Sequence, residues 1–133
     1  MRTTGEKIAG IFGATYVAIG LLGFVATGGV GFADTEGSNL LGIFEVNPLH
    51  NLVHLAIGVA LLLAFAAGAR AVTLVAGMIG VVYIAVGVVG FFVGSTDANI
   101  LALNVTDHLL HLASGAFLVL AASLARQPRP ATV

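Results

Sequence analysis

The residues of this chain with the clearest capacity for chemistry are its four histidines, and all of them fall in two short stretches of similar sequence. Residues 47–58 read Asn-Pro-Leu-His-Asn-Leu-Val-His-Leu-Ala-Ile-Gly, and residues 104–115 read Asn-Val-Thr-Asp-His-Leu-Leu-His-Leu-Ala-Ser-Gly. The stretches match at a constant offset, which relates His54 to His111 and Gly58 to Gly115. Each stretch opens a long apolar run, so polar side chains stand at two helix entrances.

Helical spacing gathers the polar residues of each stretch on one face about a third of the helix wide. Imidazole is the commonest side-chain ligand of zinc, copper and iron, so the pattern predicts a site for a divalent transition metal. Its candidate ligands are His50, His54, His108, His111 and Asp107, and the asparagines expected to support them are Asn47, Asn51 and Asn104.

Two other hypotheses remain open at this stage. In the first, His54 and His111 are an axial pair for haem, and Gly58 and Gly115 make room for the macrocycle. In the second, the histidines and asparagines are interhelical hydrogen-bonding groups of a structural or accessory membrane subunit. A proton or anion path is a weaker alternative, because the opposite halves of these apolar runs contain almost no polar side chain.

Composition places the chain in a membrane. Of its 133 residues, 59% are hydrophobic and 8% are charged, and the mean hydropathy is +1.09; a soluble domain of this size carries more charge. The net charge of −1 gives no basic field for nucleic acid. The lack of cysteine excludes disulfides and thiolate metal sites. We find no phosphate-binding loop, serine elbow or zinc-protease motif, so no enzymatic class is indicated.

Four apolar segments predict four membrane-spanning helices, at about residues 8–29, 48–68, 71–94 and 105–125. Each approaches or exceeds the roughly 20 residues that cross a bilayer. We expect one transmembrane domain over residues 1–126 and a disordered cytoplasmic tail over 127–133. The predicted fold class is therefore all-α, an integral membrane four-helix bundle.

The bundle is expected to consist of two tandem repeats, at about 8–68 and 71–125. Glycines of the first segment recur in the third at a constant offset, and Tyr16 recurs as Tyr83. Repeats with an even number of spans insert in the same direction, which predicts a pseudo-two-fold axis along the membrane normal. Both tyrosines are expected beneath the histidines. The first connection is longer, and its apolar part, 40–46, is expected at the membrane interface or as a lid.

Basic residues predict the orientation. Arg2, Lys7, Arg70, Arg126 and Arg129 all fall on one side of the predicted bundle. By the positive-inside rule that side is cytoplasmic, with both termini, and the histidines lie toward the outside of what we expect to be a bacterial inner membrane. The expected partner is the lipid bilayer, and a homo-oligomer or a larger membrane complex remains open.

The two histidine stretches, with residues 41–46 before the first, resemble a family of small four-helix prokaryotic membrane proteins known as a domain of unknown function, number forty-three eighty-three. The resemblance extends over about residues 10–122. It implies the four-helix membrane topology and supplies no substrate.

Overall fold

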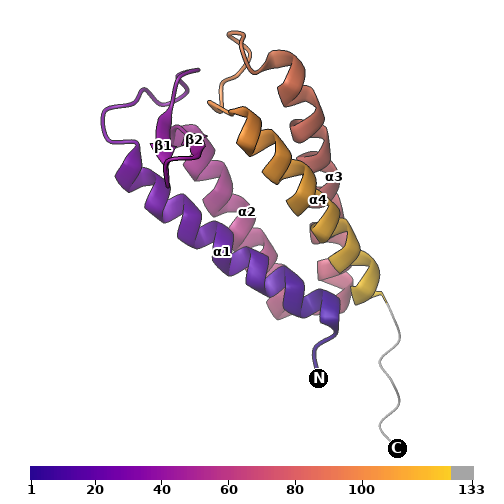
Figure 1. Cartoon of the computed structure of the whole chain (residues 1–133). Helices are drawn as coiled ribbons and strands as arrows, with labels where there is room; N and C mark the ends of the chain where they lie inside the picture. Colours follow the sequence, from indigo (N-terminus) through magenta and orange to yellow (C-terminus); the bar gives the residue numbers. More distant parts are fainter. Residues whose placement is uncertain (127–133) are drawn as a thin grey trace, which may run out of the picture.

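Four long helices make up most of the computed structural model, which describes residues 1–126 (Figure 1). They are α1 (Thr4–Ala26), α2 (Pro48–Ala67), α3 (Ala69–Val93) and α4 (Val105–Ala125). Two short strands, β1 (Ser38–Leu40) and β2 (Phe44–Val46), pair antiparallel between α1 and α2. The start of α1 and the end of α4 lie at one end of the bundle, and the hairpin and the α3–α4 loop lie at the other. The predicted tail, 127–133, lies outside the described residues.

All four helices are long and apolar enough to cross a membrane, with 23, 20, 25 and 21 residues. A hydrocarbon core of about 30 Å requires about 20 helical residues. Large apolar side chains, among them Ile11, Leu63, Met78 and Phe92, are exposed on the outside of the bundle. Such a surface is unfavourable in water and suits lipid. The helices therefore indicate an integral membrane protein, and the predicted all-α class with four helices long enough to span a membrane is confirmed apart from the unpredicted hairpin.

Three helices begin at capping side chains. The Thr3 hydroxyl accepts a hydrogen bond from the backbone N–H of Glu6, and the Glu6 carboxylate accepts one from the backbone of Thr3. Asn104 and Asp107 form the same reciprocal box at α4, and Asn47 caps α2 before its proline. A capping side chain contributes about 1 kcal/mol of helix stability. The caps set the depth at which each following residue enters the bundle.

Glycines allow α1 to pack closely on α2, and α3 on α4. A Cβ atom at Gly58 would lie 2.7 Å from the backbone nitrogen of Val17, and one at Gly13 would lie 3.0 Å from the Gly58 oxygen. In the other pair, a Cβ at Gly115 would lie 2.7 Å from the oxygen of Gly80. Small residues at these crossings let the backbones touch, which is the usual means of helix association in lipid.

An apolar core fills the half of the bundle that holds the start of α1 and the end of α4. Leu61 and Leu118 are completely buried there. The residues packed around them are mostly small: Ala9, Ala64, Val72, Ala76, Ala122 and Ala125. The four helices fill this half with hydrocarbon, which leaves the buried polar groups of α2 and α4 to the opposite half, near the loops.

Candidate metal centre

Three of the four histidines meet between α2 and α4. The ring centroids of His50 and His54 are 4.4 Å apart, and the His111 ring lies 5.9 Å from the first and 6.3 Å from the second. One ligand nitrogen from each ring can be chosen so that all three lie within 4.8 Å of one another. We call these residues the histidine cluster. All three are buried, and no other group of this kind occurs within residues 1–126.

Helix starts position the histidine cluster. Asn47 Oδ1 accepts a 2.8 Å hydrogen bond from the backbone N–H of His50, which fixes the first turn of α2. His54 follows one turn later on the same face. His111 stands as far from the Asn104 cap as His54 stands from Asn47, so both enter the bundle about two turns, or ~10 Å, from their helix ends. His54 and His111 therefore enter at equal depth, and their rings face each other at 6.3 Å, as expected from the sequence.

Three of the six ring nitrogens of the cluster are buried without a hydrogen bond of normal geometry. His111 Nδ1 lies 2.6 Å from the backbone oxygen of Asp107; a carbonyl only accepts, so Nδ1 carries the proton and Nε2 keeps its lone pair. Both ring nitrogens of His50 and Nδ1 of His54 are buried and make no hydrogen bond of normal geometry, although backbone groups of Glu45 and Leu101 lie near the His50 ring. Buried polar atoms are normally paired, because an unpaired one costs several kcal/mol in an apolar medium. The cluster therefore has buried ring nitrogens available to a ligand.

Two tyrosines complete the surroundings of the cluster. The Tyr16 ring lies 5.4 Å from His54, the Tyr83 ring lies 4.8 Å from His111, and the two tyrosine rings are 5.5 Å apart. The sequence placed both tyrosines beneath the histidines, and the structure adds that each tyrosine ring packs directly against a histidine ring. The sequence signal that both tyrosines belong to the site was the recurrence of Tyr16 as Tyr83 in the repeat.

Two of the predicted metal ligands lie apart from the cluster. The Asp107 carboxylate accepts hydrogen bonds of 3.0 Å from the backbone N–H groups of Asn104 and Glu45, so it caps α4 and holds strand β2. The His108 ring turns toward α3, where it packs edge-on against Phe91 at 5.0 Å. His108 and Glu45 also line a surface hollow of about 440 Å³ at the loop end.

The asparagines expected behind the ligands connect loops instead. Asn47 Nδ2 donates hydrogen bonds of 2.8 Å to the backbone oxygens of Asp34 and Ile100. Asn104 Nδ2 donates one of 3.0 Å to the oxygen of Ile43, in the hairpin turn. Each cap therefore holds the loop that precedes the other cap. We call this pair of contacts the reciprocal brace.

Asn51, the third asparagine, bonds within its own helix pair. Its Nδ2 donates to the Thr27 hydroxyl at the end of α1, at 3.1 Å. The positions expected to make room for haem, Gly58 and Gly115, are likewise filled from within each pair, because the backbones of α1 and α3 pack directly on them. Their faces therefore leave no space for a macrocycle.

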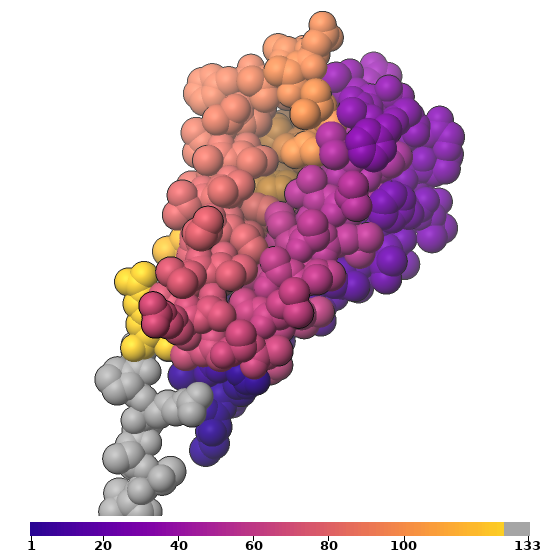
Figure 2. Space-filling model, turned by 180° about the vertical axis from the view of Figure 1, so that it is seen from behind, coloured from indigo at the N-terminus to yellow at the C-terminus, as the bar shows by residue number. Residues whose placement is uncertain are grey.

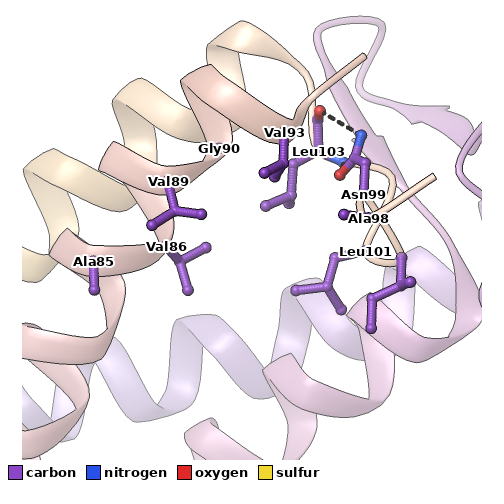
Figure 3. Close-up of a pocket in the computed structure, with 10 residues that line it drawn as sticks. Ala85, Val86, Val89, Gly90, Val93, Ala98, Asn99, Leu101 and Leu103 are labelled. Atoms are coloured by element: carbon purple, nitrogen blue, oxygen red, sulfur yellow. Dashed lines mark hydrogen bonds between the residues drawn. The ribbon is translucent and has the colours of Figure 1, made fainter. Parts of the chain in front are cut away.

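An apolar pocket of about 250 Å³ lies between α3 and the α3–α4 loop (Figure 3). The surface has a separate feature in Figure 2, a furrow between α2 and α3 at the loop end, with atoms of α4 visible at its bottom. The pocket of Figure 3 is lined by aliphatic side chains, with Asn99 as its polar member. Asn99 Nδ2 is already hydrogen-bonded to the backbone oxygens of Gly94 and Leu103. The pocket offers no ligand chemistry, and the histidine cluster remains the candidate site.

Fold and site together define a small four-helix integral membrane protein with a buried histidine cluster. The family profile described as "Domain of unknown function (DUF4383)" matches residues 7–124, which is most of the chain. The chain belongs to this family, and the resemblance inferred from its motifs is confirmed. Comparison with curated proteins and with solved structures gives no match.

Proposed function

We propose that the protein binds a transition metal ion between His50, His54 and His111. The observation that carries the proposal is the convergence of three buried imidazoles, within 4.8 Å, with three ring nitrogens that make no hydrogen bond of normal geometry. A tetrahedral zinc ion with bonds of about 2.0–2.1 Å holds its ligand nitrogens about 3.3 Å apart. Closing the cluster by about 1.5 Å is within the reach of small side-chain rotations.

Hydrogen bonding between helices is the competing role for the cluster, but no ring nitrogen of the cluster makes a hydrogen bond of normal geometry to another helix within residues 1–126. Hydrogen bonds between the two helix pairs come from Asn47, from Asn104 and from the Glu45 N–H, which donates to the Asp107 carboxylate. The hydrogen bond of His111 stays within its own helix, and the polar neighbours of the His50 ring are backbone groups of Glu45 and Leu101, outside the helices. Histidines that served as interhelical glue would bond across the interface.

The ligand set favours zinc, copper or iron over harder ions. Neutral imidazole suits these metals, whereas calcium and magnesium take oxygen ligands. The absence of cysteine removes thiolate competition for softer ions. The ordered His111 Nδ1–H resembles the second hydrogen bond that metal-bound histidines usually donate, which orients the ring and raises its basicity.

Metal analysis of detergent-purified protein tests the proposal. After loading with Zn²⁺ or Cu⁺ and removal of free ion, we expect about one ion per chain. His54→Gln and His111→Gln each lose tight binding, because glutamine keeps the size and polarity but not the imidazole. His108→Gln is the matched control, since His108 is the one histidine outside the cluster, and it keeps the ion. Wild type without metal, or equal loss in all three variants, contradicts the proposal.

The two helix pairs are, in our proposal, tandem repeats related by a pseudo-two-fold axis along the membrane normal. Matching contacts support it. Gly23 of α1 packs against the side chain of Asn51, and its counterpart Gly90 of α3 packs against His108. Tyr16 contacts His54 as Tyr83 contacts His111. Repeats of about 8–68 and 71–125, within one domain, account for both sets of contacts.

The orientation we propose places both termini in the cytoplasm and the histidine cluster toward the outside of a bacterial inner membrane. The end of the bundle with the start of α1 carries Arg2, Lys7, Arg70 and Arg126. The charged residues at the loop end are all acidic, and none of them is Lys or Arg. This asymmetry is what the positive-inside rule describes.

A further inference from the structure

Tyr83 carries a buried hydroxyl with no hydrogen bond of normal geometry. The residue is 3% exposed, and its ring lies 4.8 Å from His111 and 5.5 Å from Tyr16. Its polar neighbour is the Tyr16 hydroxyl, with which it makes at most a poorly aligned hydrogen bond. Buried tyrosine hydroxyls usually have a partner, so this one requires an explanation.

The other tyrosine differs from Tyr83 in its neighbours. The Tyr16 hydroxyl interacts with the hydroxyl of Ser114 on α4. The position on α2 that corresponds to Ser114 in the repeat is Ile57, which offers no polar atom. Ile57 packs against the same core that contains Tyr83. The exchange of serine for isoleucine therefore gives Tyr16 a polar neighbour on α4, whereas the polar neighbour of Tyr83 is Tyr16 itself.

We infer that the Tyr83 hydroxyl donates a hydrogen bond to a small exogenous ligand, a water molecule, a hydroxide or a small anion, that completes the coordination of the bound metal ion. The inference rests on the proposed function. Three histidines leave the fourth position of a tetrahedral ion open, which is the arrangement of sites that admit water or substrate. The Tyr83 ring is in contact with a cluster histidine, and its hydroxyl, which makes no hydrogen bond of normal geometry, can turn from Tyr16 to donate to such a ligand.

Azide binding to the Co²⁺-loaded protein in detergent tests the inference. The metal content of each sample is measured first, and azide affinity is then followed through the cobalt absorption bands. Tyr83→Phe keeps the metal and binds azide about tenfold or more weakly, which is the effect of losing one hydrogen bond to an anion. Tyr16→Phe is the matched control, and its azide affinity changes by less than about threefold.

The outcomes separate the inference from the function on which it rests. Wild type without cobalt overturns both. Normal cobalt content with equal azide affinity in wild type and Tyr83→Phe overturns the inference alone, and so does equal weakening in both tyrosine variants or a wild type that binds no azide. Should Tyr83→Phe not fold, global incorporation of 3-fluorotyrosine labels the two tyrosines of the chain. The more acidic phenol then strengthens azide binding, and unchanged affinity overturns the inference.

Discussion

Replacing Asn47 by alanine should destabilise the loop end of the protein by about 3 kcal/mol. The completely buried Asn47 side chain accepts from His50 N–H and donates to the oxygens of Asp34 and Ile100, each at 2.8 Å. An intramolecular hydrogen bond contributes about 0.5–1.5 kcal/mol net, so three together contribute about 1.5–4.5 kcal/mol. The free energy of unfolding is measured by reversible SDS denaturation in mixed micelles.

Two further variants calibrate the Asn47 result. Asn104→Ala removes two hydrogen bonds, to Ile43 O and from Asp107 N–H, and is expected to cost about 2 kcal/mol. Asn39→Ala, on the exposed side of the hairpin, should change the free energy by less than about 0.5 kcal/mol. If Asn47→Ala proves as mild as Asn39→Ala, the account of the reciprocal brace is refuted.

Two other predictions concern packing and orientation. Gly58→Ala places a Cβ 2.7 Å from the Val17 nitrogen and should destabilise the bundle by about 1–3 kcal/mol in the same assay; Gly28→Ala, with nothing within 4 Å, should be neutral, and equal effects would argue against the close crossing. In the cysteine-free chain, a membrane-impermeant maleimide applied to intact cells should label Ser95→Cys, and label Arg70→Cys only after permeabilisation. The reverse pattern would invert the proposed topology.

The sequence predicted the four helices and the approach of His54 on α2 to His111 on α4 because both follow from local, periodic signals. Apolar runs of spanning length leave few alternatives to helices in lipid. The stripe positions of His54 and His111 follow from helical geometry once the caps at Asn47 and Asn104 are recognised. The prediction failed for His108, which lies at the edge of the polar helix face, where a side chain can contact either of two neighbouring helices.

His108 illustrates that limit. It lies at the edge of the predicted stripe, close in angle to both the cluster and α3. The repeat itself contained the answer, because His108 corresponds to Asn51, and both turn toward the glycine face within their own helix pair. A helical projection gives the angle of His108, but it does not show that the missing side chain at Gly90 leaves room for the His108 ring.

The hairpin was beyond sequence reasoning for a different reason. Its turn places Leu41 at φ 56° and Gly42 at φ 76°. Glycine adopts such angles readily, but leucine does so rarely. Only one of the two turn positions therefore has a residue typical of a tight hairpin turn. What stabilises it is a distant contact, the hydrogen bond from Glu45 N–H to the carboxylate of Asp107.

The reciprocal brace has a consequence for how the protein is made. Asn47 is hydrogen-bonded to the loop of the second helix pair, and Asn104 is hydrogen-bonded to the hairpin turn of the first. Neither helix pair can therefore form all the hydrogen bonds of its own loops before the other pair is present. The ribosome delivers α1 and α2 long before the residues that complete them. Assembly of the periphery must therefore wait for the last span to enter the bilayer, and any ion can be captured only by the finished chain.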